Sequence, residues 1–372
     1  MVENPVRREE VRQGKPVFLS QGNLTLKAAL SQAYGLGHAV LFGNARSGIR
    51  ALLEVLAMAG KPALIPSNMC SAPLAAVVAA EARPVAVAVS ALNGHVSAKR
   101  FQEVMRAEPV PGIVMPTHLY GHHEDYAELH ADGWFVLEND TLCAATARGG
   151  TRRAIGDALV VSFNQVKTIE AGGGGAILTD DAAVAAELLA VTAGWAEVSD
   201  ADHQVEEHLM LARRHLRALG RMPLSEALFD LDFPMTARAF APAQRGAIES
   251  AFARTPEIIE AKRRRQEDWL RALELIAAAF VQPLEPPAVP WRLTLGVADP
   301  ESRNKIVTAL RCAGIDAGTN YLPLGREFLG HMPELEDAEI WAGRVLNLWL
   351  TERYDETEIQ RAVDVIRSAL DA

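Results

Sequence analysis

A lysine followed at short distance by four consecutive glycines is the first feature of this sequence that could do chemistry. The stretch reads SFNQVKTIEAGGGG over residues 162–175, and two apolar runs flank it, ALVV before and AILT after. Both runs predict buried strands, which puts Lys167 in the loop between them. Most lysines in loops are simply solvated. A lysine at the end of a buried sheet, however, is also well placed to form a Schiff base with an aldehyde cofactor.

The glycines at 172–175 allow two interpretations. A glycine-rich loop can cradle a phosphate with its backbone N–H groups, but GGGG fits neither GxxxxGK[ST] nor a GxGxxG fingerprint between a first strand and a helix. Nucleotide binding by this loop is therefore not expected. The second interpretation is steric, because glycine lets a bulky group lie against the backbone. It predicts that the loop makes room for a cofactor beside Lys167.

Short apolar runs alternate with helix-like segments from residue 38 onward. HAVLFG, PALIP, PVAVAV, GIVMPTH and WFVLEN each predict a strand, and SGIRALLEVLAMAG predicts a helix over about 47–59, stopped by Gly60. Repeated strand–helix–strand units build a mainly parallel sheet with helices on both faces. Ligands bind such sheets at the carboxyl ends of the strands. Five loops should therefore converge: Asn44 to Gly48, Pro66 to Ser71, Thr117 to Gly121, Asn139 to Thr141 and Phe163 to Lys167.

The last third of the chain predicts a second, smaller α/β domain. The region 196–240 has little pattern, and a long helix is expected over about 243–279. The proline-rich VQPLEPPAVP then breaks the chain before the strand WRLTLGV, a helix across 300–313 and the strand VLNLWL. We therefore expect two domains, residues 1–242 and residues 243–372.

The final helix has a well-marked start. Asp355, with Glu358 three residues later, fits a capping box in which Asp takes the place of Ser or Thr. The apolar face of this helix would hold Ile359, Ala362, Val363, Ile366 and Leu370.

Composition excludes several classes of function. The 372 residues are 49% hydrophobic, enough for a large core, and the net charge of −10 argues against a general affinity for nucleic acid. Cys70, Cys143 and Cys312 are odd in number and lack metal-ligand spacing, so we expect reduced thiols and no metal. No run of about 18 apolar residues occurs, and the polar start lacks a signal-peptide core. We expect a cytoplasmic protein with no membrane partner.

The lysine stretch, SFNQVK followed by GGGGA, resembles the lysine motif of the DegT/DnrJ/EryC1/StrS aminotransferases. These are pyridoxal 5′-phosphate (PLP) enzymes of fold type I, and most of them aminate nucleotide-linked keto sugars. Their motif runs Ser-Phe-His, two residues, Lys, and then Gly-Glu-Gly-Gly-Ala. Further stretches match family segments in the same order along the chain: ARSGIRAL at 45–52, PTHLYG at 116–121, AIGDALVVSF at 154–163, AGIDAGTNYLPL at 313–324 and RVLNLWLTERYDETEIQRAVDVI at 344–366.

The resemblance implies a large PLP-binding domain, a smaller C-terminal domain and a homodimer with active sites at the subunit interface. It implies transfer of an amino group from an amino acid, glutamate above all, to a keto group on a nucleotide-linked sugar or a related intermediate. Lys167 would bind PLP as a Schiff base and move the proton between substrate and cofactor.

The resemblance also assigns the groups around that lysine. Ser162 would hold the PLP phosphate by its hydroxyl, and Ser47 and Gly48 would contact it at the start of their helix. Tyr120 and Tyr321 would lie against the substrate. Purely structural alternatives stay open, because Ser47 could be a plain N-cap, Ser162 could bond within the sheet, and Tyr321 could serve packing.

Several positions depart from the family pattern. Asn139 falls on the Asp that pairs with the pyridine nitrogen of PLP, and Leu142 falls on a Gln or His. A neutral Asn cannot hold the protonated ring by charge. Either Asp140 takes the role through a one-residue shift, or the ring is less electron-withdrawing. Cys70 stands about where the family has an aromatic stacked on the ring.

Two further departures lie in the same motifs. Ile49 replaces a threonine of the phosphate site, and Gly173 replaces the glutamate of Gly-Glu-Gly-Gly. These changes leave two alternatives open besides an aminotransferase. One is a PLP enzyme of another reaction type, such as elimination or racemisation. The other is a catalytically silent family member that acts as a binding protein.

Overall fold

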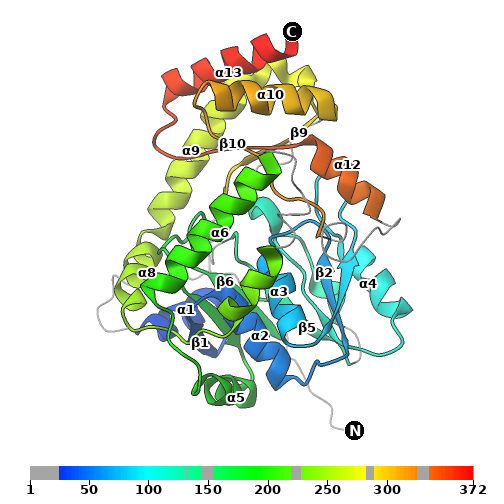
Figure 1. Ribbon diagram of the computed structural model, residues 1–372, viewed down its shortest axis with the longest axis vertical. Coiled ribbons are helices and arrows are strands. Elements are labelled where there is room, and N and C mark those ends of the chain that lie inside the picture. Colours follow the sequence, from blue (N-terminus) through cyan, green and yellow to red (C-terminus); the bar gives the residue numbers. More distant parts are fainter. Residues whose placement is uncertain are drawn as a thin grey trace, which may run out of the picture.

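A seven-stranded sheet forms the centre of the larger part of the molecule (Figure 1). The computed structural model describes residues 25–130, 133–143, 154–218, 228–281, 289–324 and 335–371. The strand order is β1-β7-β6-β5-β4-β2-β3, and every pair is parallel except those of β7, which runs antiparallel to β1 and β6. The expected mainly parallel α/β fold is confirmed. The strands are β1 (His38–Phe42), β2 (Pro62–Pro66), β3 (Arg83–Val87), β4 (Ile113–Val114), β5 (Phe135–Asn139), β6 (Ala158–Ser162) and β7 (Gly175–Thr179).

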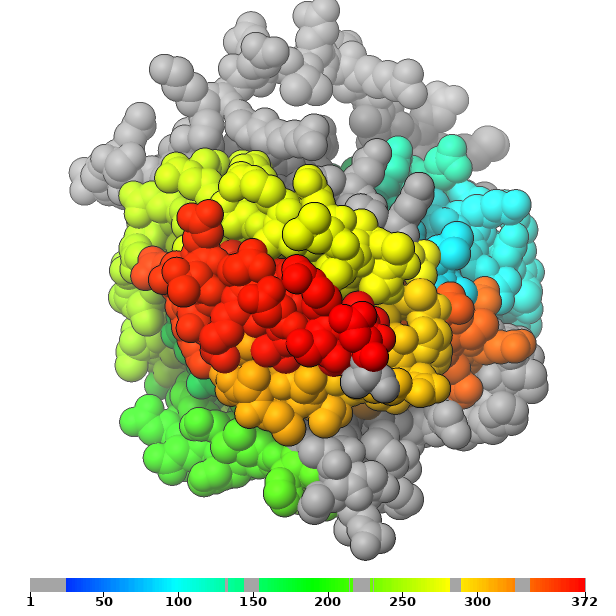
Figure 2. Space-filling model, turned by 90° about the horizontal axis from the view of Figure 1, so that it is seen from above, coloured from blue at the N-terminus to red at the C-terminus, as the bar shows by residue number. Residues whose placement is uncertain are grey.

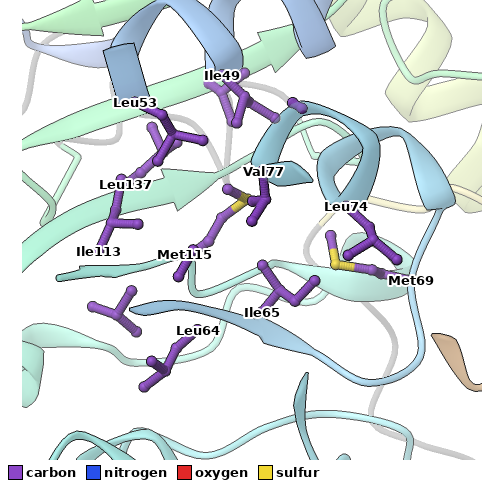
Figure 3. Packing of buried hydrophobic residues seen from close by; sticks show 14 of the residues in the cluster. Ile49, Leu53, Leu64, Ile65, Met69, Leu74, Val77, Ile113, Met115 and Leu137 are labelled. Atoms are coloured by element: carbon purple, nitrogen blue, oxygen red, sulfur yellow. The ribbon is translucent and has the colours of Figure 1, made fainter. Parts of the chain in front are cut away.

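Helices cover both faces of this sheet because successive strand residues point to opposite sides. In β1, Val40 and Phe42 pack in the core with α2 and α3, whereas Ala39 and Leu41 pack with α1 on the other face. Figure 3 shows part of the first core, where Ile49 and Leu53 of α2 lie over Leu137 of β5. The helices of the larger part are α1 (Leu26–Tyr34), α2 (Ala45–Val55), α3 (Ser71–Ala79), α4 (Ala98–Ala107), α5 (Ala182–Thr192) and α6 (Asp200–Ala218), with short 3₁₀ turns η1 (Leu119–Gly121), η2 (Ala127–Leu129) and η3 (Leu228–Thr236).

A separate four-stranded antiparallel sheet, in the order β10-β11-β9-β8, carries its own core near the C-terminus. Its strands are β8 (Phe280–Val281), β9 (Leu293–Val297), β10 (Ala317–Gly318) and β11 (Val345–Leu348). The helices around it are α9 (Thr255–Leu273), α10 (Pro300–Cys312), α12 (Glu336–Arg344) and α13 (Glu356–Asp371). Figure 2 shows α13 in red lying against α10 and α9. The exact division at residue 242 remains a prediction.

The predicted start of the last helix agrees with the structure. The Asp355 carboxylate accepts a hydrogen bond of 2.9 Å from the backbone N–H of Glu358, which is the N-cap half of the expected capping box. The Glu358 side chain pairs instead with Arg361. The predicted apolar face is buried except for Leu370, which is half-buried.

Two element predictions were wrong in detail, and one helix was missed. The single helix expected over 243–279 is broken into α8 (Gln244–Ala253), α9 and the 3₁₀ turn η4 (Glu274–Ala279). Pro256 lies in the first turn of α9, and because proline has no N–H and clashes with the preceding turn, a new helix starts there. The region 196–240 holds the helix α6, and α2 spans Ala45–Val55 rather than 47–59.

No helix among the described residues is both long and apolar enough to cross a membrane.

Candidate active site

One pocket forms where the carboxyl ends of the parallel strands meet, and all five predicted loops contribute to it. It contains about 640 Å³ of empty space, part of it open to solvent. The lining residues are Asn44, Ala45, Arg46, Ile49, Met69, Cys70, Ala72, Pro73, Thr117, Leu119, Asn139, Thr141, Leu142, Ser162, Asn164, Lys167 and Tyr321. The predicted site residues that the structure brings together here are Lys167, Ser162, Cys70, Asn139, Leu142 and Tyr321.

The first turn of α2 faces this pocket, but three residues earlier than expected. Asn44 is the N-cap, and its Oδ1 accepts hydrogen bonds from the backbone N–H and the hydroxyl of Ser47, both at 2.9 Å. Asn44, Ala45 and Arg46 therefore line the pocket. Their signal in the sequence was Asn44 itself, since Asn is a preferred N-cap.

Ser47 and Gly48 lie behind that turn. The fully buried Ser47 hydroxyl also contacts the carbonyl oxygen of Met235 at 3.2 Å and accepts the Arg238 N–H at 3.0 Å. A Cβ on Gly48 would meet Ile177 and Phe42 in the core. Neither residue is among those that line the pocket. Their direct contact with a phosphate stays a prediction, and the structure gives both a packing role.

Lys167 lies in the pocket at the end of a loop with an unusual backbone. The preceding residue, Val166, has φ of 58°, a left-handed conformation that is costly for a β-branched side chain. The carbonyl oxygen of Val166 accepts a 2.7 Å hydrogen bond from the indole Nε1–H of Trp291. Trp291 in turn stacks on Tyr321, with ring centroids 5.9 Å apart and an angle of 9° between the rings. The segment that leads into β9 thus holds the loop that carries the lysine.

Burial lowers the pKa of the Lys167 ammonium from its ordinary value, because the charged form is poorly solvated there. The Cys70 sulfur opposes this shift and raises the pKa, and the Arg292 guanidinium lowers it further. Arg292 lies between two indole rings, 4.3 Å from the centroid of Trp291 and 3.8 Å from that of Trp349. The pocket therefore favours a neutral, nucleophilic amine.

The four glycines serve a purpose other than the one expected. A Cβ on Gly175 would lie 2.5 Å from the backbone nitrogen of Ala45, and a Cβ on Gly174 would lie 2.8 Å from Ile248. A Cβ on Gly173 would collide with His203. Protein lies against Gly173, Gly174 and Gly175, a Cβ on Gly172 would meet nothing within 4 Å, and none of the four is among the residues that line the pocket. The prediction that the glycines make room for a cofactor is corrected: Gly175 lets α2 approach the lysine hairpin, and Gly173 and Gly174 let α6 and α8 approach it.

The polar residues at the end of β5 point in different directions. Asn139 lines the pocket and is 1% exposed. Asp140 is fully buried and turned away, with its carboxylate 3.4 Å from Nε2 of His123. Because side chains alternate along a strand, a one-residue shift that brought Asp140 into the pocket would take Asn139 out of it. Of the two candidates for the ring nitrogen, the structure puts Asn139 in the pocket.

Tyr120 lies one layer behind Tyr321. Its phenol is fully buried, and its oxygen accepts hydrogen bonds from the backbone N–H of Tyr321 at 3.2 Å and from Nε1 of Trp341 at 3.0 Å. Burial raises the pKa of Tyr120 to about 12, so the hydroxyl stays protonated. Tyr120 does not line the pocket, and its predicted substrate contact remains a prediction.

Arg46 carries a positive charge to the pocket wall and is held by two acids. Its guanidinium lies 3.0 Å from Glu206 and 3.1 Å from Asp232, and Asp232 also pairs with Arg213 at 2.8 Å. These partners come from α6 and η3, the region in which the sequence showed little pattern.

The model of the DegT/DnrJ/EryC1/StrS aminotransferase family matches residues 7–367. The chain belongs to this family. The members of the family are PLP-dependent aminotransferases, and the resemblance read from the lysine motif is confirmed.

Solved structures of this aminotransferase family share the fold. DesV of S. venezuelae superimposes with a TM-score of 0.71 at 20% identity, covering 95% of this chain and 92% of DesV. The putative sugar aminotransferase Spr1654 of Streptococcus pneumoniae, solved in its PMP form, superimposes with a TM-score of 0.71 at 15% identity, covering 97% of this chain and 99% of Spr1654. DesI, solved in the presence of its TDP-sugar product, superimposes with a TM-score of 0.70 at 19% identity, covering 92% of this chain and 83% of DesI.

The pocket of this DegT-family chain offers a group for each polar end of PLP. The Lys167 amine suits the aldehyde. The Ser162 hydroxyl lies in the same pocket as the first turn of α2, whose dipole favours an anion such as phosphate. The Asn139 amide offers a hydrogen-bonding partner for the ring nitrogen, while Ile49 and Leu142 supply apolar surface. The residues present therefore fit PLP.

Proposed function

We propose that this protein binds PLP through Lys167 and transfers an amino group from an amino acid, with glutamate as donor, to a keto group on a nucleotide-linked sugar or a related biosynthetic intermediate. The observation that carries the proposal is the Lys167 amine, depressed in pKa, in one pocket with Ser162 and the start of α2. The DesI complex with a TDP-sugar product supports the acceptor class.

Each residue of the pocket has a separate role in the proposed reaction. Bound PLP would supply an electron sink for bonds at the substrate's reacting carbon. Lys167 would bind the aldehyde and, once released by substrate, its amine would take the proton from the substrate's reacting carbon and deliver it to the cofactor. The Ser162 hydroxyl and the α2 dipole would orient the phosphate, and the buried side chains of Leu142 and Ile49 would exclude water from the part of the pocket that they line.

The Tyr321 ring forms part of the pocket wall, and we propose that it contacts the substrate. Burial raises the pKa of its phenol well above the ordinary value, so it acts as a neutral donor or an apolar surface rather than as a base. We also propose a homodimer in the cytoplasm, as the family resemblance implies. Light scattering on the purified protein tests the assembly.

The first experiment is reductive trapping. The protein is incubated with PLP, its absorption spectrum is recorded, borohydride is added, and the adduct is located by peptide mapping. We expect a visible band and an adduct on Lys167. Lys262 of α9 is the matched control, because burial lowers its pKa to about 8 and makes it the competing amine. An adduct on Lys262 alone would refute the role of Lys167.

The second experiment tests the reaction. The PLP-loaded protein is mixed with glutamate and other amino donors, and loss of the visible band is followed before a panel of nucleotide-linked keto sugars is added. We expect ping-pong kinetics and an aminated sugar. The Lys167→Ala protein should show neither loss of the band with glutamate nor an aminated sugar. Elimination or racemisation products with an unchanged band would favour the second candidate, a PLP enzyme of another reaction type, which Asn139 in the pocket supports.

A further inference from the structure

Asn139 is fixed in the pocket by backbone hydrogen bonds at the end of β5. Its backbone N–H donates to the carbonyl oxygen of Pro116 at 2.8 Å, and its own carbonyl oxygen accepts the N–H of His118 at 3.1 Å. The side chain is 1% exposed and lines the pocket. Its amide is therefore a preorganised group whose orientation decides what kind of atom it can bind.

One hydrogen bond fixes that orientation. The backbone N–H of Thr141 lies 3.2 Å from the side-chain oxygen of Asn139. A backbone N–H can only donate, so the amide end that faces it must be Oδ1. The Nδ2 group, with its two hydrogens, is left as the end that a ligand can reach. Within the described parts of the chain, no acceptor lies within hydrogen-bond distance of it.

The other two asparagines of the pocket differ in this respect. Asn44 donates from Nδ2 to the carbonyl oxygen of Met235 at 3.0 Å and accepts from Ser47. Asn164 donates from Nδ2 to Glu206 at 3.4 Å and accepts the N–H of Gln165 at 2.8 Å. Both ends of these amides have partners in the protein. Asn139 is thus the pocket amide that presents a hydrogen-bond donor to a ligand.

Carboxylates nearby are directed elsewhere. Glu138 bonds to Nε2 of His118 at 2.6 Å and accepts the N–H of Ile155 at 2.9 Å. Asp140 faces His123 and Cys143. None of the described residues that line the pocket is acidic, whereas Arg46 and Lys167 are both basic. An added positive charge on a bound ring would meet no carboxylate in this lining, because the two acids that pair with Arg46 do not line the pocket.

We propose that Asn139 holds the ring nitrogen of bound PLP in its unprotonated form, by donating a hydrogen bond from Nδ2 to that nitrogen. This rests on the proposed function and deepens it. A donor stabilises the neutral, accepting form of the nitrogen, and the pocket offers no charge that would stabilise the protonated form. A neutral ring withdraws electrons less, so proton removal from the substrate depends more heavily on Lys167. Substrates whose C–H bond is already acidic are favoured.

The test uses PLP labelled with ¹⁵N at the ring nitrogen and bound to the wild-type protein. We expect its NMR signal in the range of unprotonated pyridine at neutral pH, and a move to the pyridinium range in Asn139→Asp. That variant keeps an oxygen to accept the Thr141 N–H, so the local fold is preserved. Asn164→Asp is the control, because it adds a carboxylate to the same pocket at another position, and its signal should stay with the wild type.

The outcomes separate the two proposals. A wild-type signal in the pyridinium range, with the borohydride adduct on Lys167, overturns the role of Asn139 and leaves the PLP site intact. A protein that neither binds labelled PLP nor forms an adduct overturns both. An equal shift in Asn164→Asp and Asn139→Asp would also overturn the role of Asn139, since any carboxylate in the pocket would then suffice.

Discussion

The indole of Trp291 donates its hydrogen bond to the carbonyl oxygen of Val166, the residue just before Lys167, although the two lie 125 positions apart in the chain. Val166 has a positive φ that its branched side chain disfavours. A hydrogen bond from another part of the fold is a direct way to hold such a conformation. The position of the lysine therefore depends on the segment that leads into β9.

Replacing this tryptophan tests that dependence. Trp291→Phe keeps a ring to stack on Tyr321 but removes the N–H, which should cost about 1 kcal/mol. Because the loss falls on the lysine loop, we expect slower capture of PLP by Lys167, measured by stopped-flow absorption. Trp269→Phe is the matched control, because it removes an indole N–H that donates to the carbonyl oxygen of Trp349, away from the lysine loop. Equal slowing in both variants would contradict a specific effect.

The reactivity of Lys167 should show its depressed pKa. Only the neutral amine reacts with an aldehyde, so the labelling rate rises with pH and reaches half its maximum at the pKa. Because burial lowers this pKa, the midpoint should lie below about 10.4, the ordinary value for lysine. Reductive alkylation across pH with peptide mapping measures it, and Lys262 should show a midpoint near about 8 in the same samples.

Replacing Cys70 tests its effect on the pKa of Lys167. The sulfur raises the pKa of Lys167, so Cys70→Ala should move the Lys167 midpoint to lower pH and leave that of Lys262 in place. A midpoint that rises, or that moves equally for both lysines, would rule out this interaction.

The glycine contact with α2 predicts a large loss of stability from a small change. Gly175→Ala puts a methyl group 2.5 Å from the Ala45 nitrogen, and neither backbone can give way easily. We expect the free energy of unfolding to fall by about 3 kcal/mol, measured by urea denaturation. Gly246 of α8 is the control, because it is exposed and a Cβ there would meet nothing within 4 Å. Gly246→Ala should instead raise the free energy of unfolding by about 0.5 to 1 kcal/mol.

The acid that anchors Arg46 should also matter to stability. Asp232 is 3% exposed and pairs with both Arg46 and Arg213. Asp232→Asn removes the negative charge that both arginines face, so the free energy of unfolding should fall by about 3 kcal/mol. Asp268→Asn, which breaks partly exposed pairs with Arg265 and Arg271, should lower the free energy of unfolding by less than about 1 kcal/mol. Thermal unfolding of the two variants compares them directly.

Local pattern was enough to predict most of the fold. Runs such as HAVLF and ALVVS became strands because nearly all their residues are buried, on both faces of the sheet, and the loops after the parallel strands met in one pocket as sheet geometry requires. The helix α6 was missed because its polar residues outnumber its apolar ones, which left little periodic signal.

What the sequence could not supply were contacts between distant segments. The pairing of Arg46 with Asp232 spans 186 positions, and the approach of Ala45 to Gly175 depends on how two strands lie side by side. Side-chain direction at the end of β5 was equally out of reach. It follows from the strand register, which puts Asn139 opposite Val160, and from the Thr141 hydrogen bond.

The insertion of β7 between β1 and β6 has a consequence for the order in which the protein can be made. Residues 38–42 and 158–162 become neighbours only through residues 175–179, which pair with both. A chain that ends before β7 lacks the strand that joins β1 to β6, so the loop of Lys167 and the first turn of α2 are not yet joined through one sheet. The pocket can therefore be completed only after residues 175–179 have been made.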